Sequence, residues 1–261
     1  MGNFSLDFIG LQNIKTLFAY YPALLTHDFE NRMRQSIRVL HYQYLYGACE
    51  EAQTILPKYP TDNLFDTIMK LYNKRRKRHL AGFLLLHCFE NALRSTLAVE
   101  IAHLYNHDAD DWFLKKQGRN AKENQLLRQV ATILAKRQLE ISAPQNTFDV
   151  FDLFSLWDLQ KITEAHWNKL APLFTSEKSY KNQPIPRYKT QEHLIGTINK
   201  IRHARNEIFH NKPTQIKFQN DVENLLLRLG YNLQDAIDIG EIRNVIPLQY
   251  NYDSESTPSP E

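Results

Sequence analysis

The chain has 261 residues, enough for one large domain or two small ones with a sizeable core. Hydrophobic residues make up 43% and charged residues 23%, as in soluble globular proteins, and the 8 glycines are few for a turn-rich barrel or sandwich. The net charge of +3 permits a polyanionic partner without requiring one. Cys49 and Cys88 are too few for a disulfide framework or a zinc site and lie in apolar helical stretches, which predicts buried, reduced thiols.

The first residues predict neither a signal peptide nor myristoylation. MGNFSLDFIG has no basic start followed by an apolar run, and Leu6 stands where myristoylation prefers Ser or Thr. The most apolar run, residues 80–89, is too short to span a bilayer. We therefore expect a cytoplasmic protein with no membrane partner.

The first half of the chain has the apolar spacing of amphipathic helices, three and four residues. It predicts a helix over residues 28–56 and a loop over 57–63, where two prolines stop the helix. Two more helices are expected over 62–78 and 80–105, the second apolar on most faces, as in the middle of a bundle. The loop is the best internal boundary, between an N-terminal helical segment (1–60) packing on the core and a main domain (61–252).

The second half continues the helical pattern. Residues 107–113 predict a turn with a capping aspartate, followed by an amphipathic helix that ends near Pro144. The aromatic-rich residues 148–173 predict two short helices, and 175–190 an exposed loop. A helix over 191–211, limited by Pro213, and a last helix around 222–229 follow. Residues 245–252 are the one strand candidate, and 253–261 predict a disordered tail. The fold class is all-α, a helical bundle.

The helix over 191–211 carries an arginine where packing alone would favour an apolar residue. Its apolar face holds Leu194, Ile198, Ile201 and Ile208. Arg205 lies on that face, where a guanidinium is costly unless it is paired or opens to a cleft. Asn206 and His210 are one turn apart, and the long Arg205 side chain can swing toward the histidine. The three groups can therefore border one cleft.

This combination suits chemistry on a phosphodiester. His210 is expected in the last helical turn, where the helix dipole favours the protonated imidazole. A histidine that readily carries a proton beside an arginine can move protons at a phosphate. Solvated helix faces also carry Arg, Asn and His frequently, so the spacing alone leaves an ordinary surface open. The core-facing position of Arg205 favours a site.

Two other charged clusters have alternative interpretations. Five consecutive basic residues can bind RNA phosphates, serve as a nuclear signal, or form a solvated helix end: Lys74, Arg75, Arg76, Lys77 and Arg78. The aspartates at 108, 110 and 111 could suggest a metal site, but helix capping is favoured because no second cluster supplies the remaining ligands. We expect no metal and no cofactor.

The segment RNEIFH, residues 205–210, resembles the R-N-x-x-x-H motif of HEPN domains. FLLLHCFENALRSTLAVEIAHLYN and the following DDWF resemble the long helix of abortive-infection (Abi) family proteins, whose E-x-x-x-R pair would be Glu90 and Arg94. The stretch FSLWDLQKI is similar to that family's later aromatic stretch, so the resemblance spans roughly residues 64–211. It implies an all-α bundle with a HEPN-like core and metal-independent endoribonuclease activity, often in phage defence or toxin–antitoxin systems.

The resemblance also implies residue roles. Arg205 would hold the scissile phosphate and stabilise its developing charge, His210 would act as general acid or base, and Asn206 would orient a reacting group. Glu90 would pair with Arg205 from the neighbouring helix, with Arg94 as its competing partner. The basic run could line an RNA path.

Partners follow from the same resemblance: RNA as substrate, a homodimer whose two motif copies face each other, and an antitoxin or other regulatory protein. One departure is Lys212, which stands where some HEPN toxins carry a tyrosine that a partner nucleotidyltransferase modifies. Neutralisation by that route is not expected. The alternative is a catalytically silent HEPN module that binds RNA, a nucleotide or a protein partner. A purely helical scaffold would leave Arg205 unexplained.

Overall fold

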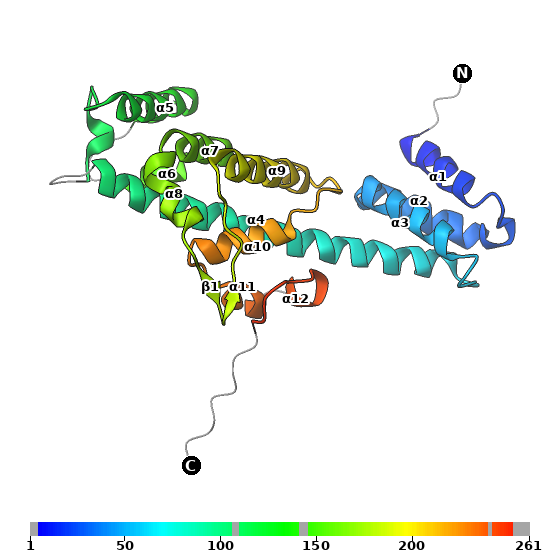
Figure 1. The fold of residues 1–261 in the computed structure, drawn as a ribbon. Helices are drawn as coiled ribbons and strands as arrows, with labels where there is room; N and C mark the ends of the chain where they lie inside the picture. Colours follow the sequence, from blue (N-terminus) through cyan, green and yellow to red (C-terminus); the bar gives the residue numbers. More distant parts are fainter. Residues whose placement is uncertain (1–4, 106–109, 141–145, 240–241, 253–261) are drawn as a thin grey trace, which may run out of the picture. The chain divides into compact units, whose positions relative to one another are not determined.

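The computed structural model describes residues 5–105, 110–140, 146–239 and 242–252 (Figure 1). Over these residues the protein is an all-α helical bundle apart from one antiparallel hairpin, formed by β1 (Ser179–Tyr180) and β2 (Gln183–Pro184). No helix in this part of the chain is long and apolar enough to cross a membrane. The chain divides into two compact units, one of residues 1–82 with 207–215 and the other of 83–206 with 216–261.

The first unit is built from α1 (Leu6–Leu17), the 3-10 helix η1 (Pro22–Leu24), α2 (His27–Val39), α3 (Tyr42–Ile55) and the N-terminal half of α4 (Leu64–Tyr105). Helix α1 packs against both α2 and α3. The core of this unit includes the fully buried Ile14, Phe18, Met33 and Leu45. Cys49 also lies in it, and burial raises the pKa of its thiol to about 12, as expected for an inert thiol.

The single helix expected over residues 28–56 is wrong, because the chain leaves the helix between α2 and α3. Leu40 has an extended backbone (φ −99°, ψ 155°), and a new helix begins at Tyr42. The break allows both halves of the apolar stripe to enter one core, since Phe29, Met33 and Tyr44 are all buried there. Neither proline nor glycine marks this break, so the sequence pattern ran through it.

Helix α4 runs unbroken for 42 residues, where the sequence predicted two helices that meet near residue 79. No proline interrupts it, and the basic residues 74–78 have high helix propensity. Gly82 costs only about 1 kcal/mol relative to alanine within a helix. The preceding loop over residues 57–63 is confirmed. One continuous helix therefore supplies side chains to both units.

The second unit contains the remaining elements. They are the C-terminal half of α4, the 3-10 helix η2 (Trp112–Leu114), α5 (Ala121–Arg137), α6 (Thr147–Asp152), α7 (Leu156–Ala165), α8 (Trp167–Thr175), the β1–β2 hairpin, α9 (Gln191–Phe209) up to Asn206, α10 (Gln219–Arg228), α11 (Leu233–Ile239) and α12 (Ile242–Val245). Its core includes Phe89, Leu93, Phe151, Phe154 and Ile198. The sequence missed α11 and α12.

Residues 148–173 form three short helices instead of the predicted two. Capping boxes begin α6 and α7, where Asn146 pairs with Asp149 and Ser155 with Asp158. In each box the side chains satisfy backbone N–H groups that a helix start leaves without partners. These S/N-x-x-D signals were present in the sequence and could have located both starts.

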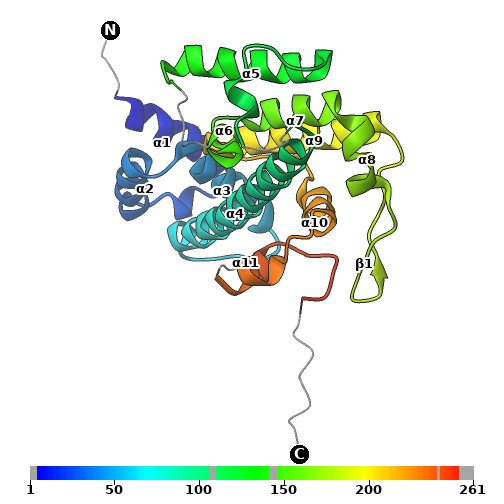
Figure 2. The ribbon, with the colours of Figure 1, turned by 90° about the vertical axis from the view of Figure 1, so that its left-hand side faces the viewer.

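The exposed loop expected over residues 175–190 is only partly correct. The β1–β2 hairpin extends from α8 (Figure 2), and its tip holds Lys181 and Asn182 at φ 44° and 62°. Two consecutive positive φ values belong to a tight hairpin turn, and asparagine tolerates that conformation. Ile185 and Tyr188, just beyond the hairpin, are buried. The segment is therefore anchored into the second unit.

The strand expected at residues 245–252 is also wrong. Helix α12 ends at Val245, and no strand follows within the described residues up to 252. Instead the fully buried Glu223 carboxylate accepts hydrogen bonds from the backbone N–H of Gln249 (2.8 Å), from that of Tyr250 (3.1 Å) and from the Tyr252 hydroxyl (3.0 Å). A side chain thus supplies the acceptors that a neighbouring strand would otherwise provide. The predicted tail, 253–261, lies outside the described residues.

The aspartates before η2 cap differently from the prediction. Asp111 occupies the N-cap position of η2, but its side chain makes no capping hydrogen bond. Asp110 instead accepts from the backbone N–H of Thr147 (3.0 Å), the first residue of α6, and from the Thr147 hydroxyl. Trp112 Nε1 also donates to that hydroxyl (2.9 Å). Asp108 lies outside the described residues.

Candidate active site

The apolar face expected on α9 is confirmed. Leu194, Ile198, Ile201 and Ile208 are all buried. Arg205 shares this face, and its side chain is 27% exposed. Packing alone would not favour a guanidinium at this position, so its charge must be compensated.

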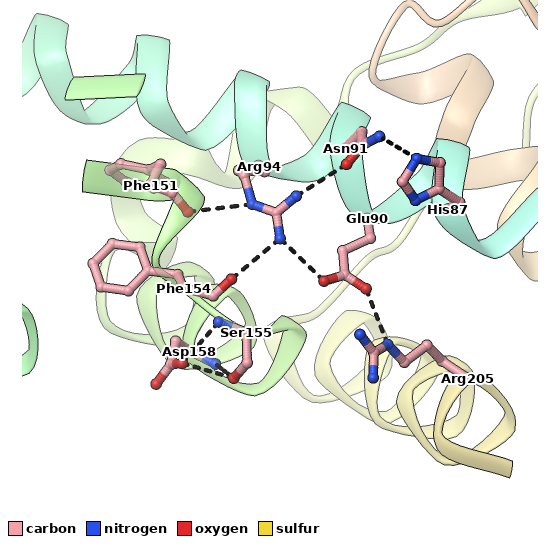
Figure 3. A network of polar contacts seen from close by, with 9 residues as sticks. All are labelled: His87, Glu90, Asn91, Arg94, Phe151, Phe154, Ser155, Asp158 and Arg205. Atoms are coloured by element: carbon pink, nitrogen blue, oxygen red, sulfur yellow. Dashed lines mark hydrogen bonds and ion pairs between the residues drawn. The ribbon is translucent and has the colours of Figure 1, made fainter. Parts of the chain in front are cut away.

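The compensating group is Glu90 on α4, as the sequence predicted. Arg205 Nε donates to Glu90 Oε2 at 3.0 Å, and Arg94 Nη2 donates to Glu90 Oε1 at 3.0 Å. The carboxylate therefore lies between two guanidinium groups (Figure 3). Its side chain is only 9% exposed, which strengthens both ion pairs relative to pairs in water. Arg94 and Arg205 share the carboxylate instead of competing for it.

Arg94 is held from four directions within the second unit. Besides Glu90, it donates from Nε to the backbone carbonyl of Phe151 (3.2 Å) and from Nη2 to that of Phe154 (3.2 Å). Its Nη1 donates to Asn91 Oδ1 (3.0 Å). The two carbonyls lie at the end of α6 and just before α7, so Arg94 fixes Glu90 relative to these helices. We regard Arg94 as a structural support for the Glu90–Arg205 pair.

The C-terminal end of α9 determines where His210 lies. The helix ends at Phe209, two residues earlier than predicted, so the exposed His210 is the first residue beyond it. The prediction that His210 lies in the last helical turn is therefore wrong. Asn211 follows with φ 55°, its N–H bonds to the Ile208 carbonyl (2.9 Å), and the Lys212 N–H bonds to the Glu207 carbonyl (2.8 Å). This is the Schellman arrangement, which satisfies carbonyls that a helix end leaves open.

Helix α9 crosses the division between the units. Arg205 and half-buried Asn206 belong to the second unit, whereas His210 belongs to the first. The network of Glu90, Arg94 and Arg205 is a feature of the second unit alone. Along the chain, the three proposed site residues remain within the last two turns of α9 and the residue that follows.

The basic run of residues 74–78 divides into two sets on α4. Arg75 and Arg76 are half-buried: Arg75 Nη2 forms an ion pair with Glu51 at 3.0 Å, and the Arg76 guanidinium lies 5.5 Å from the Tyr44 ring centroid. Lys74, Lys77 and Arg78 are exposed. The structure thus assigns Arg75 and Arg76 packing contacts in the first unit and leaves the other three cations at the surface.

Two features escaped the sequence prediction. In the first unit, the buried His79 hydrogen-bonds through Nδ1 to the Tyr44 hydroxyl, and burial lowers the pKa of His79. In the second unit, the indole of Trp157 is 45% exposed and lies beside two cations, Arg202 and Lys161. The sequence carries no signal for the second feature, because the pattern around Trp157 does not show that its ring is exposed and Arg202 is distant along the chain.

The chemistry of the arrangement is that of anion recognition and proton transfer. Among the described residues, no group of three or more His, Cys, Asp or Glu side chains could hold a metal ion. Three groups follow one another along the chain at the end of α9: the Arg205 guanidinium, which Glu90 braces, the Asn206 amide and the exposed His210 imidazole. Such groups can bind a phosphate and move a proton at its oxygens.

No family model, curated protein or solved structure matches the chain. The likeness of residues 205–210 and of α4 to the HEPN motif and the Abi helix therefore remains a hypothesis that depends on those residues.

Proposed function

We propose that this protein is a metal-independent endoribonuclease of the HEPN type that cleaves RNA through the 2′-hydroxyl. The observation that carries the proposal is the Glu90–Arg205 ion pair. It braces a guanidinium on the apolar face of α9, one residue before Asn206 and five before His210. An arginine held in this way is preorganised to bind a phosphate without rearrangement.

Each step of the proposed reaction has a named group. The 2′-oxygen attacks the adjacent phosphorus, the bond to the 5′-oxygen breaks, and a 2′,3′-cyclic phosphate remains. Arg205 stabilises the negative charge that develops on the phosphate oxygens. His210 removes the proton of the 2′-hydroxyl or protonates the leaving 5′-oxygen. Asn206 orients one of these groups through its amide. DNA lacks the 2′-hydroxyl and is not cut.

The test is RNA cleavage by the purified protein and its variants. We expect Arg205→Ala and His210→Ala each to lower cleavage by at least about 100-fold, the contribution typical of one positioned acid–base or charge-stabilising group. His203→Ala is the matched control, since His203 is an exposed histidine on the same helix. Circular dichroism must show unchanged helicity. Full cleavage by both site variants would refute the assignment.

Two further measurements define the reaction class. Cleavage should persist in excess chelator, and the products should carry 2′,3′-cyclic phosphate ends. A matched DNA oligonucleotide should remain intact. Strict dependence on a divalent ion, or linear phosphate ends from the first moment of reaction, would exclude the proposed chemistry.

The cellular role proposed from the resemblance is a toxin or phage-defence effector, acting as a homodimer and restrained by an antitoxin or other regulatory protein. Expression should then halt growth, and His210→Ala should relieve the arrest. The alternative is a silent HEPN module that binds RNA, a nucleotide or a protein. The surface cations Lys74, Lys77 and Arg78 would supply RNA binding in this alternative. Tight RNA binding without any cleavage would favour it over the ribonuclease.

A further inference from the structure

Trp157 presents a large apolar ring at the surface of the second unit. It lies in the first turn of α7, between the two residues of the Ser155–Asp158 capping box, and it is 45% exposed. The contrast with Trp112 is informative, because Trp112 is completely buried and its indole N–H is hydrogen-bonded to Thr147. Trp112 packs the core, whereas burial in the core does not explain Trp157.

Two cations lie over the Trp157 ring. The Arg202 guanidinium carbon and the Lys161 ammonium nitrogen are each 4.8 Å from the ring centroid. Lys161 comes from the next turn of α7, while Arg202 comes from α9, which lies beside α7 in both ribbon views (Figures 1 and 2). An exposed aromatic ring flanked by cations is the combination that single-stranded nucleic acids contact, with bases on the ring and phosphates on the cations.

Arg202 retains hydrogen-bonding capacity. Its Nη2 donates to Asn199 Oδ1 at 2.6 Å, but its buried Nε has no acceptor among the described residues. A buried guanidinium N–H without a partner is costly, and an incoming phosphate or base carbonyl would lower this cost by supplying an acceptor. This donor is the second observation that points to a ligand at Trp157.

The position relative to Arg205 determines what the ligand would be. Arg202 and Arg205 are three residues apart on α9 and therefore lie near one face, separated along the axis by about 4.5 Å. One strand that contacts Arg205 would therefore pass Arg202 as well. A nucleotide whose phosphate lies on Arg205 would thus bring a neighbouring base to Trp157.

We propose that Trp157, Arg202 and Lys161 form a subsite for single-stranded RNA, in which a base stacks on the indole and the flanking phosphate contacts the two cations. The inference rests on the proposed function, since it assigns the substrate class of the same site. Base-paired RNA does not fit, because its bases are stacked inside the helix and present no face to the indole.

The experiment uses the full chain carrying His210→Ala, so that RNA binds without being cut. The probes are a short oligouridylate, a ribose–phosphate chain of equal length without bases, and a base-paired duplex. Tryptophan fluorescence reports stacking and titration reports affinity. We expect the oligouridylate to quench fluorescence, and Trp157→Leu to weaken its binding roughly 5- to 150-fold, which corresponds to about 1–3 kcal/mol per stacked base.

Two variants control the measurement. Trp167→Phe removes a half-buried indole of the same unit and should keep both quenching and affinity. Trp157→Phe should lose the quenching but keep part of the affinity, because the smaller ring still stacks. Trp157→Phe also guards against misfolding as the cause of any loss, since it preserves an aromatic ring at the surface.

Cleavage by the chain with His210 intact is assayed in parallel to separate the two proposals. If RNA is cut but the oligouridylate and the base-free chain bind equally without quenching, the subsite is wrong and the ribonuclease assignment stands. If stacking depends on Trp157 but no RNA is cut, the subsite stands as a binding site and the assignment fails. If the protein neither binds nor cuts RNA, both proposals are wrong.

Discussion

At the scale of single residues, Glu90 carries two cations with one carboxylate. One of its oxygens accepts from Arg205 and the other from Arg94, both at 3.0 Å. Neither arginine is fully exposed, at 27% and 17%, so losing the shared negative charge leaves two poorly solvated guanidinium groups facing each other. The arrangement therefore depends more on Glu90 than on either arginine.

We expect Glu90→Gln to lower the free energy of unfolding by about 2–3 kcal/mol, since the amide preserves shape but loses the charge that both guanidinium groups use. Urea denaturation measures this loss. Cleavage should fall as well, because Arg205 is no longer fixed. Glu140→Gln, at an exposed site, should change neither quantity. Unaltered stability in Glu90→Gln would show that the pair contributes nothing.

The Glu90–Arg205 pair was predictable because each residue is a charge at an apolar helical position, and two such charges reduce each other's cost. The bonds from Arg94 to the Phe151 and Phe154 carbonyls were not, since they join residues 57 and 60 positions apart with no charge on the acceptor. The Trp157–Arg202 contact was missed for a related reason. The contact is informative because the Trp157 ring is exposed, and a sequence pattern does not reveal the exposure of a side chain.

At the scale of elements, the basic residues 74–78 of α4 fall on two sides of the helix. Arg75 contacts Glu51 and Arg76 contacts the Tyr44 ring. Lys77 and Arg78 follow Lys74 by about one turn on the exposed side. The exposed set lies at the surface, where phosphates can reach it. The two sets should consequently respond differently to the same substitution.

Replacing Lys74, Lys77 and Arg78 with glutamine should reduce the slope of log affinity against log salt by about 2, because each lost contact with a single strand removes about 0.7. Affinity should fall alike for all sequences. Arg75→Gln with Arg76→Gln should instead lower the thermal midpoint, since it removes the ion pair with Glu51 and the contact with Tyr44. An unchanged salt slope in the triple variant would mean that the exposed set is only solvated.

Helix ends were predictable where a proline follows the apolar repeat of the helix, as at residues 57–63 and before Pro213. The errors concern helix boundaries at which no proline stands. The chain leaves the helix at Leu40 without a proline or glycine, and α4 continues through His79, whose side chain is buried and hydrogen-bonded to Tyr44. Apolar periodicity alone marks neither position.

At the scale of the whole molecule, each unit contains one buried, hydrogen-bonded histidine among the residues that the structure describes. In the first unit His79 pairs with the Tyr44 hydroxyl; burial lowers its pKa, and Arg76 and His41 lower it further. In the second unit His166 Nε2 bonds to the Tyr105 hydroxyl (2.8 Å) and Nδ1 to the Ile162 carbonyl (3.1 Å), and burial lowers its pKa too. Burial therefore favours the neutral form of both imidazoles.

We therefore expect mild acid to destabilise both units. A histidine whose folded-state pKa lies below its unfolded value of 6.5 contributes full stability above pH 6.5, and this contribution is lost as the pH falls through the folded-state pKa. Each histidine adds a slope of up to about 1.4 kcal/mol per pH unit in that window. Denaturation between pH 7 and 5 measures it. His166→Gln should flatten the slope, and an unchanged slope would mean that protonation of His166 is not the cause.

The division into units was beyond sequence reasoning, because the first unit takes residues 207–215 from late in the chain. Local patterns indicate where a helix begins and ends, but not which distant segment completes a core. The proline loop at 57–63 was the strongest boundary signal, yet it joins α3 and α4 inside the first unit.

That late segment has a consequence for synthesis on the ribosome. Residues 1–82 emerge early, but the segment beginning at Glu207 follows only after 124 intervening residues, the difference between 206 and 82. At a synthesis rate of about 5–20 residues per second, residues 207–215 of the first unit are made roughly 6 to 25 s after residues 1–82. The same segment carries His210. A nuclease built in this order would stay inert during most of its own translation, and it would acquire its acid–base group when its first unit becomes complete.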